Sequence, residues 1–309
     1  MEKVIVICGP TATGKTDLAI DLALEVGGEI ISADSAQIYK YMDIGTAKPT
    51  MEERRGIPHH MIDLVYPDED FSVARYKTDS EGVIRDVLSR GKVPIVAGGT
   101  GLYINALVYN IHFSETICDW DFRERMRKLA TLNGPEYLHE RLKEIDPVSA
   151  DKIHANNVKR VIRALEVYET TKKPISAHQA ESRVEAAGFD YRVYGLMADR
   201  EKLYERTDKR VDTMVAKGLA EEIRGILERG YSRSLVSLQA IGYKEMIAAI
   251  YNECTIDEAV SRIKIGTHHL AKRQMTWFKS IGNIEWLDTG TLERRAMLKI
   301  LVDALNNQV

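Results

Sequence analysis

The feature that most constrains this chain is an octet near its start that fits the phosphate-binding pattern G-x-x-x-x-G-K-[ST]. The octet is Gly9-Pro10-Thr11-Ala12-Thr13-Gly14-Lys15-Thr16. The residues before it, Lys3 to Cys8, are apolar enough for a buried strand, and Leu18, Leu22 and Val26 after it recur at helical spacing. A strand, a glycine-rich loop and a helix in this order are the context that the motif requires. The octet therefore predicts a loop that binds a di- or triphosphate.

The chemistry of the octet explains why it suits phosphate. Its glycines let backbone N–H groups turn inward, and the N-terminus of the following helix adds partial positive charge. Lys15 supplies a full positive charge, and the hydroxyl of Thr16 is a ligand for Mg²⁺. We therefore assign all eight residues, Gly9 to Thr16, to diphosphate or nucleotide binding, with Mg²⁺ as the expected cofactor.

The composition of the 309 residues allows one large domain or two ordinary ones, and it excludes several classes of protein. No apolar run approaches the length of a membrane span, and the chain passes from Met1 straight into the first predicted strand, without room for a signal peptide. The three cysteines are scattered and have no metal-binding spacing. We therefore expect a cytoplasmic protein with no membrane partner. The net charge of −3 does not point to a nucleic-acid binder, so local charge patterns have to decide that question.

Strand and helix patterns alternate in the first third of the chain. Further strands are predicted at residues 29–33 and 93–97, with a helix at about 71–90 between them. From about residue 118, charge-rich helical patterns follow one another until residues 191–197 form a strand pattern again. This order predicts an α/β fold with a P-loop NTPase-like parallel sheet core, formed by residues 1–117 and 189–309. Residues 118–188 are predicted to be an inserted all-helical subdomain.

The ends of the predicted strands narrow the chemistry. Proteins of this loop type that hydrolyse ATP or GTP usually end a later apolar strand with an Asp that holds Mg²⁺ through water. Here the strand at 93–97 ends in Gly98-Gly99-Thr100-Gly101, and no Asn in the chain precedes a Lys, which removes the usual guanine-binding element. Asp34 follows the strand at 29–33, at the sheet edge where ligands bind. It is a candidate general base, or else a cap of the next turn together with Ser35.

Two basic stretches stand out in a chain that is acidic overall. Arg160 and Arg163 lie one helical turn apart, and residues 262–280 contain seven basic or histidine side chains and no acidic one, with Trp277 and Phe278 among them. A basic stripe with aromatic residues suits a phosphate backbone and unpaired bases. The other reading is a solvated helix face over core aromatics. The pattern favours nucleic acid.

The chain resembles the tRNA dimethylallyltransferases, also called tRNA isopentenyltransferases, through an ordered series of motifs rather than one. After the octet the series continues with Ser32–Tyr39, Asp43–Pro49, His59-His60, Gly98–Tyr103, Arg160–Val167, Ile241–Lys244 and Ala271–Phe278. The resemblance implies transfer of a dimethylallyl group from dimethylallyl diphosphate to N6 of an adenosine, with release of diphosphate. The acceptor would be the adenosine immediately 3′ of the anticodon, in tRNAs that read codons beginning with U. The implied partners are the tRNA anticodon arm and the prenyl donor, and we expect a monomer.

The resemblance also assigns residues. It implies catalytic roles for Asp34 as the base and for Lys15, Arg210 and Thr11 at the diphosphate, although by sequence alone Arg206, one turn from Arg210, is not separated from it. The implied tRNA contacts are Asp34, Ser35, Ala36, Gln37, Thr100, Arg123, Lys159, Arg160, Arg163, Gln239, Gly242, Tyr243 and Lys244.

The sequence departs from the family pattern at two places. Asn157 stands where an Asp is usual, and His268-His269 stands where Arg-Gln-Tyr-like residues are common. His59-His60 with Asp63 resembles a metal cluster, but the spacing is too short and a fourth ligand is missing, so zinc is not expected.

Three other functions remain open from the sequence. A small-molecule or nucleoside kinase shares the phosphate loop, but would leave the basic stretches without a role. An adenylate prenyltransferase shares the donor chemistry, but a free nucleotide needs neither the helical insertion nor the basic C-terminal helix. An RNA-binding protein that only senses a nucleotide would not need Asp34.

Overall fold

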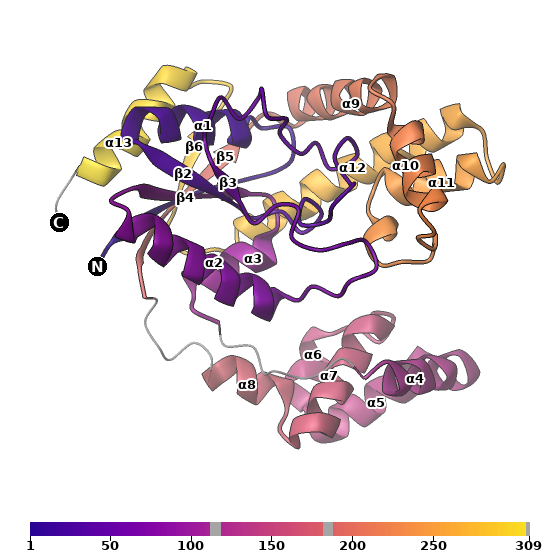
Figure 1. The fold of residues 1–309 in the computed structure, drawn as a ribbon. Coiled ribbons are helices and arrows are strands. Elements are labelled where there is room, and N and C mark those ends of the chain that lie inside the picture. The colour runs from indigo at the N-terminus through magenta and orange to yellow at the C-terminus, as the bar shows by residue number, and fades with distance from the viewer. Residues whose placement is uncertain (112–118, 182–187, 307–309) are drawn as a thin grey trace. The chain divides into compact units, whose positions relative to one another are not determined.

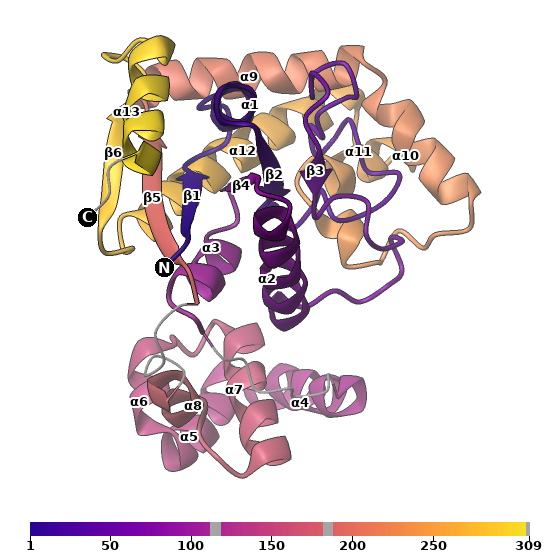
Figure 2. The same ribbon diagram turned by 60° about the vertical axis from the view of Figure 1, so that its left-hand side comes forward.

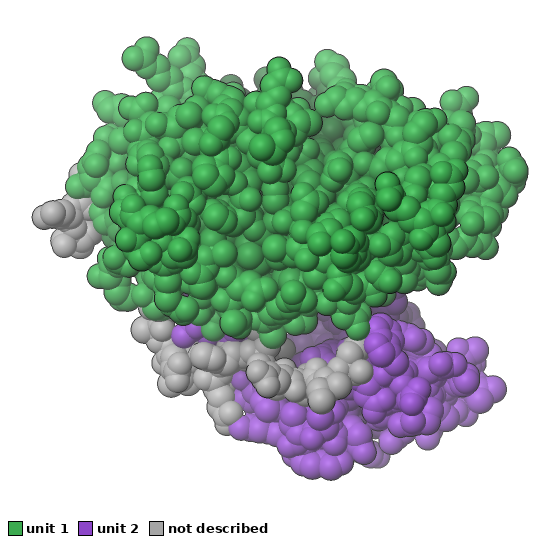
Figure 3. Space-filling model, viewed as in Figure 1, with its two compact units in different colours: residues 1–105, 188–309 green, residues 106–187 purple. Residues whose placement is uncertain are grey.

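The computed structural model describes residues 1–111, 119–181 and 188–306. The chain divides into two compact units, residues 1–105 with 188–309, and residues 106–187 (Figure 3). The predicted domain boundary at residues 117 and 118 lies outside the described residues. In the described part of the chain, no helix is both long and apolar enough to cross a membrane.

The first unit is built on a parallel sheet with the strand order β3-β2-β4-β1-β5-β6 (Figure 2). The strands are β1 (Lys3–Cys8), β2 (Gly28–Ser32), β3 (His59–His60), β4 (Val93–Gly98), β5 (Asp190–Met197) and β6 (Ile284–Asp288). In the central strand β1, Ile5 pairs with Ile95 of β4 on one side and with Arg192 of β5 on the other. Residues Val4 to Cys8 are fully buried, as expected for a strand covered on both faces. The prediction of an α/β fold with a parallel sheet is confirmed.

Helices cover both faces of this sheet (Figure 1). On one face, Leu18 and Leu22 of α1 pack with Met297 and Leu301 of α13 against the sheet. On the other face lies α2, whose buried Tyr76 donates a hydrogen bond from its hydroxyl to the carbonyl of Ser32 at 3.1 Å. The helices of this unit are α1 (Lys15–Val26), α2 (Val73–Ser89), α9 (Arg200–Ala216), α10 (Leu219–Glu228), η1 (Ser237–Gln239), α11 (Tyr243–Ile250), α12 (Ile256–Phe278) and α13 (Arg294–Asn306). Helix α3 (Gly101–Val108) begins in this unit and ends in the second.

A second apolar core holds α9 to α12 together beside the sheet. It centres on buried side chains of these helices, among them Val211, Ile223, Tyr243 and Ile263, and on Met42 from the segment after β2. The longest helix, α12, begins at a capping box in which Thr255 and Glu258 satisfy each other's backbone N–H groups. This core fixes α9 and α12 against the carboxyl edge of the sheet.

The second unit is helical in its described residues. Its helices are α4 (Trp120–Asn133), α5 (Pro135–Ile145), α6 (Pro147–Lys152), α7 (Val158–Thr171) and α8 (Ile175–Glu181). Apolar side chains of α4, α5 and α7 form its core, with Leu138 and Leu142 of α5 fully buried. The side chain of Asp146 accepts hydrogen bonds from Ser149 and Ser176, which ties the start of α6 to α8.

The parallel arrangement brings three chain segments to one edge. β1, β2 and β4 all end there, so Gly9, Asp34 and Thr100 follow neighbouring strands. Two glycines allow the close approach: a Cβ on Gly98 would collide with the carbonyl of Ala33, and one on Gly9 would collide with the backbone of Leu196. Gly9 also has a φ of 143°, which L side chains rarely adopt.

A buried carboxylate at the start of β2 leads to a stability prediction. Glu29, with a side chain 7% exposed, accepts hydrogen bonds from Arg90 and His60, and these partners lower its pKa from 4.5 to about 2. Glu29→Gln should lower the free energy of unfolding near neutral pH by about 1–3 kcal/mol, because charge-assisted hydrogen bonds are lost. The depressed pKa means that this contribution is present above the unfolded pKa near 4.5 and is lost as the pH falls toward 2.

Denaturant unfolding of the wild type and the variant at several pH values measures this contribution. The matched control is Glu221→Gln, because Glu221 is 70% exposed and pairs only across a helix surface with Arg224. We expect this control to change the unfolding free energy by less than about 0.5 kcal/mol. Equal unfolding energies for Glu29→Gln and the wild type at neutral pH would contradict the prediction.

Candidate active site

The octet forms a compact loop between β1 and α1. Its backbone turns through positive φ at Gly9, Ala12 and Gly14. The hydroxyl of Thr13, which is 3% exposed, donates to the carbonyl of Pro10 at 2.9 Å, and the Lys15 ammonium donates to the same carbonyl. These bonds hold the loop in shape, while Gly14 and Thr16 are exposed at the N-terminus of α1. The loop thus presents a helix N-terminus and a hydroxyl to the outside.

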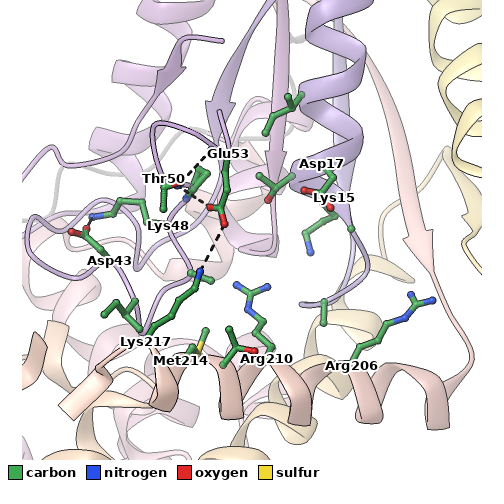
Figure 4. A pocket seen from close by; sticks show the side chains of 18 residues that line it. Lys15, Asp17, Asp43, Lys48, Thr50, Glu53, Arg206, Arg210, Met214 and Lys217 are labelled. Atoms are coloured by element: carbon green, nitrogen blue, oxygen red, sulfur yellow. Dashed lines mark hydrogen bonds and ion pairs between the residues drawn. The ribbon is translucent and has the colours of Figure 1, made fainter. Parts of the chain in front are cut away.

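Lys15 and Arg210 form the positive centre of the site. Figure 4 shows the Lys15 ammonium and the Arg210 guanidinium directed into the same space, from α1 and α9 respectively. Burial, together with the nearby Arg210, lowers the pKa of Lys15 from 10.5 to about 8, and the Asp34 carboxylate opposes both. Burial also lowers the pKa of Arg210, again opposed by Asp34. Two partly desolvated cations this close are poised to receive an anion.

The first of two cavities opens in front of these cations. It has a volume of about 500 Å³ and extends from the loop to the segment after β2 and to α9 (Figure 4). At its edge, Lys217, the residue that follows α9, pairs with Glu53 at 3.9 Å, and Glu53 also accepts the backbone N–H of Thr50 at 2.9 Å. The side chains that line it include Lys15, Thr16, Asp17, Ile44, Lys48, Arg206, Arg210 and Met214. The cavity therefore combines cations with some apolar surface.

A second cavity, also of about 500 Å³, contains Asp34. Its walls come from the loops after β2 and β4, from α9, from the residues before α11, and from α12. Its lining includes Thr11, Asp34, Thr100, Val211, Ile241, Ile263, Gln274 and Trp277. Among the described residues, Arg210 and Met214 are the two that line both cavities. Arg210 and Met214 of α9 thus border both the cavity of the phosphate loop and the cavity that contains Asp34.

The hydrogen bonds around Asp34 bear on its two predicted roles, a turn cap and a general base. Its Oδ1 accepts the backbone N–H of Ala36 at 2.9 Å, as in a turn cap, while the part of the chain that the structure describes provides no hydrogen bond to Oδ2. Thr100 lies beside it: its hydroxyl accepts the N–H of Ser35 at 2.9 Å and donates to the Ser35 hydroxyl at 3.2 Å. One carboxylate oxygen therefore fixes the side chain, and the residue lines the second cavity.

Gln274 of α12 is a site residue that the sequence reasoning did not single out. Its Oε1 accepts the N–H of Thr11 at 2.9 Å, and its Nε2 donates to the carbonyl of Gly99 at 2.9 Å. The amide thus joins the phosphate loop to the loop after β4. The available signal was its spacing from Trp277, which lines the same cavity one helical turn later.

The residues that the resemblance assigned to tRNA in the first unit differ in accessibility. Ser35, Gln239 and Lys244 are exposed, and Ala36 and Gly242 line the second cavity. The side chains of two other assigned residues make contacts within the protein. Tyr243 is fully buried and donates to Glu222 at 2.7 Å. Gln37 is engaged internally, by the Ser32 hydroxyl and the carbonyls of residues 46 and 47.

The assigned residues of the second unit fall into two groups. Lys159 and Arg160 at the start of α7 are exposed. Arg123 donates to both oxygens of Glu166 at 2.8 Å, and Arg163 donates to the same carboxylate at 2.7 Å. Because Glu166 is only 1% exposed, this cluster fixes the positions of both arginines.

The departures from the family pattern also have defined surroundings. Asn157 precedes α7 but makes no side-chain cap. His268 contacts Asp208 at 2.8 Å and stacks on Tyr204 with ring centroids 4.0 Å apart. Both partners belong to α9, so the imidazole of His268 packs against that helix. His60 pairs with Glu29 and Asp63 pairs with Lys48 at 2.6 Å, so these side chains serve as ion-pair partners.

Comparisons with known proteins agree with this architecture. The IPP transferase family model matches residues 37–281, and the isopentenyl transferase model matches residues 2–64. A tRNA dimethylallyltransferase of Acetivibrio thermocellus is 57% identical over 93% of this chain and 92% of its own length. One of Caldanaerobacter subterraneus is 52% identical over 92% of this chain and 91% of its own length.

Two solved structures are also similar. A tRNA isopentenylpyrophosphate transferase from Staphylococcus epidermidis is 43% identical, with a TM-score of 0.74 and full coverage of both chains. A eukaryotic dimethylallyltransferase acting on tRNA is 31% identical, with a TM-score of 0.84, over 100% of this chain and 81% of that one. The family match over most of the sequence, together with the identity to these relatives, shows that this chain is an enzyme of the IPP transferase family.

Proposed function

We propose that this protein transfers the dimethylallyl group of dimethylallyl diphosphate to N6 of the adenosine immediately 3′ of the anticodon, in tRNAs that read codons beginning with U. The observation that carries the proposal is the pair of cavities that share Arg210 and Met214, with a cationic diphosphate cradle in one and Asp34 in the other. A group-transfer enzyme with two unlike substrates needs such a connected pair of sites.

The first cavity suits the donor. The backbone N–H groups of the loop, Lys15 and Arg210 surround the space where a diphosphate would lie. Allylic C–O bonds break readily because the positive charge that develops is delocalised, so the main task is to stabilise the departing diphosphate electrostatically. Thr11 lines the second cavity and not the first, and its backbone N–H is held by Gln274.

The second cavity suits the acceptor. N6 of adenine would attack C1 of the dimethylallyl group, the C1–O bond would break, and its electron pair would leave with the diphosphate. The proton lost from N6 would pass to Asp34, whose Oδ1 is already fixed by Ala36. Thr100 and Ser35, which are hydrogen-bonded to each other, are positioned to orient the base. The base has to leave the anticodon loop stack to enter this cavity.

The metal proposal concerns Thr16. Its hydroxyl is exposed at the N-terminus of α1, in the same cavity as Lys15 and Asp17, and hydroxyl and carboxylate oxygens are ligands that Mg²⁺ prefers. We propose that Thr16 and the donor's phosphate oxygens hold Mg²⁺, which would neutralise charge on the leaving diphosphate.

The tRNA would contact both units. In the second unit the exposed Lys159 and Arg160 are suited to backbone phosphates, and Arg123 and Arg163 are held on the neighbouring helices by Glu166. In the first unit the exposed Ser35, Gln239 and Lys244 belong to segments that border the second cavity. With a tRNA substrate the protein would act in the cytoplasm.

The test uses the whole protein with Mg²⁺, radiolabelled dimethylallyl diphosphate and unmodified tRNA that has an adenosine 3′ of its anticodon. Label in N6-prenyladenosine after digestion of the RNA supports the proposal. Parallel reactions with AMP as acceptor, and with ATP as a possible donor of phosphate, separate the alternatives. Label transferred to AMP alone would indicate an adenylate prenyltransferase, and consumption of ATP without prenyl transfer would indicate a kinase.

Donor binding should depend on pH through Lys15. The pKa of Lys15 in the free enzyme is lowered to about 8 by burial and by Arg210, and a bound diphosphate would raise it. Binding therefore favours the protonated form, so affinity is full below the free pKa and falls above it. We expect the dissociation constant of a non-reactive donor analogue to rise above pH 8, by up to about tenfold per pH unit. The variant Lys15→Met should show a flat profile, and the same pH dependence in both proteins would contradict this role.

A further inference from the structure

We infer that Met214 sets the length of the prenyl group that this enzyme accepts, an inference that rests on the function proposed above. Met214 lies one helical turn after Arg210 on α9, and these two side chains border both cavities. Figure 4 shows Met214 beside Arg210 at the α9 wall of the first cavity. Met214 therefore borders both the cavity of the phosphate loop and the cavity that contains Asp34.

The donor has to reach both cavities. Its diphosphate belongs near Lys15 and Arg210, while its C1 has to meet the acceptor nitrogen near Asp34. The hydrocarbon attached to C1 consequently lies beside Arg210 and Met214, the residues that both cavities share. Along α9 the guanidinium of Arg210 suits the diphosphate, and one turn later the apolar thioether of Met214 suits the hydrocarbon.

The surroundings of Met214 limit how far the hydrocarbon can extend. Met214 packs against the apolar core that contains Met42, Val211 and Tyr243, so dense packing rather than open space lies behind it. Each cavity has about 500 Å³, more than a short prenyl chain needs, so the volume of the cavities is not what limits chain length. The limit is the side chain at their junction. A five-carbon group ends before it, whereas the second isoprene unit of a ten-carbon group would collide with it.

The experiment compares two donors, dimethylallyl and geranyl diphosphate, for transfer to the same tRNA. The same C1–O bond breaks and the same N–C bond forms with either donor, so the ratio of their kcat/KM values reports the fit of the hydrocarbon alone. Met214→Ala removes three heavy atoms from the junction. We expect it to raise the geranyl to dimethylallyl ratio by at least about tenfold, since one methylene is worth about 10- to 200-fold in an enclosed apolar site.

Two controls define the result. Met214→Leu keeps the side-chain volume and should keep the wild-type ratio. Met275→Ala makes the same chemical change at a half-buried position of α12 that lines neither cavity, and it should also keep the wild-type ratio. A Met214→Ala ratio that rises by less than about fivefold, or an equal rise in Met275→Ala, overturns the inference.

A second measurement covers the case in which Met214→Ala folds poorly or turns over slowly. Met214→Val removes less volume, and for both variants the inhibition constant of geranyl diphosphate against donor-analogue binding can be measured without turnover. We expect the inhibition constant of geranyl diphosphate to fall relative to that of dimethylallyl diphosphate. An unchanged ratio of these two inhibition constants overturns the inference.

If the wild type transfers no dimethylallyl group to tRNA, the proposed function fails. An active wild type with an unchanged ratio in the variants refutes the role of Met214 alone.

Discussion

Asp34→Asn should lower kcat for prenyl transfer by at least about 10²-fold, which is the usual contribution of a positioned general base. The amide keeps an oxygen for the backbone N–H of Ala36, so the turn after β2 is preserved. What is lost is the carboxylate that takes the proton from N6. Because removal of a negative charge also leaves Lys15 and Arg210 less compensated, binding of the anionic donor should be unchanged or slightly stronger.

This separation of kcat from donor affinity distinguishes a base from a structural residue. Single-turnover rates and donor dissociation constants for the wild type and Asp34→Asn provide the measurement. The matched control is Asp68→Asn, an exposed Asp outside both cavities, which should behave like the wild type. A variant with wild-type turnover would contradict the proposed mechanism, and a loss confined to donor binding would place Asp34 at the diphosphate instead.

Lys15→Met should reduce kcat/KM for the donor by about 10²- to 10³-fold, the effect of removing one preorganised group that stabilises a developing negative charge. The loop should survive this change, since the carbonyl of Pro10 still accepts the Thr13 hydroxyl when the ammonium is gone. The apolar Met fills the partly desolvated position at lower cost than an unpaired cation. The loss should therefore come from the missing charge at the leaving diphosphate.

The control for Lys15 is another lysine of the same cavity. Lys217 lines the first cavity but is paired with Glu53 at its edge, so Lys217→Met should lose less than one-tenth as much activity. Steady-state kinetics with varied donor at saturating tRNA measure both variants. Equal losses would mean that the cavity acts through its total charge and not through the loop lysine.

The sequence predicted the central architecture because its signals were local and strong. The apolar run at Lys3–Cys8, the glycine loop and the helix after it are neighbours in the chain, and the structure has them as β1, the loop and α1. Parallel strands end at one edge, so the contact between Ser35, the neighbour of Asp34, and Thr100 follows from the places of these residues after β2 and β4. Helix α5 is also locally determined, because Pro135 suits the first turn of a helix and the apolar spacing continues to Ile145.

Other elements gave weaker signals. Strand β3 is two residues long, and β6 mixes charged and apolar residues at the end of the sheet, so neither was predicted. The bounds of strand β2 were predicted less accurately than its existence, because it ends at Ser32 and not at the predicted residue 33. Short edge elements depend on neighbours that lie far away in the sequence, which single-chain patterns do not reveal.

The site residues also divide into those that local sequence patterns indicate and those whose roles depend on distant parts of the chain. Gln274 reaches Thr11 across 263 residues, and the position of Met214 between two cavities depends on how α9 packs, so local patterns could not find either role. The assignment of Tyr243 to tRNA followed from its motif, but a motif does not tell which way a side chain points, and this one points into the core. The sequence shows the basic pair that includes Arg163. The ion pair of Arg163 with Glu166, three residues later, was not predicted.

The central claim is that a donor held by the phosphate loop reacts with an adenosine beside Asp34. It is tested most directly by locating the label in the RNA after reaction of the wild-type enzyme with radiolabelled dimethylallyl diphosphate and an unmodified tRNA with adenosines at several loop positions. The account predicts that N6 of the adenosine immediately 3′ of the anticodon carries the label, and that the Asp34→Asn enzyme leaves that position unlabelled on the same timescale. Label at other adenosines, or equal labelling by both enzymes, would contradict it.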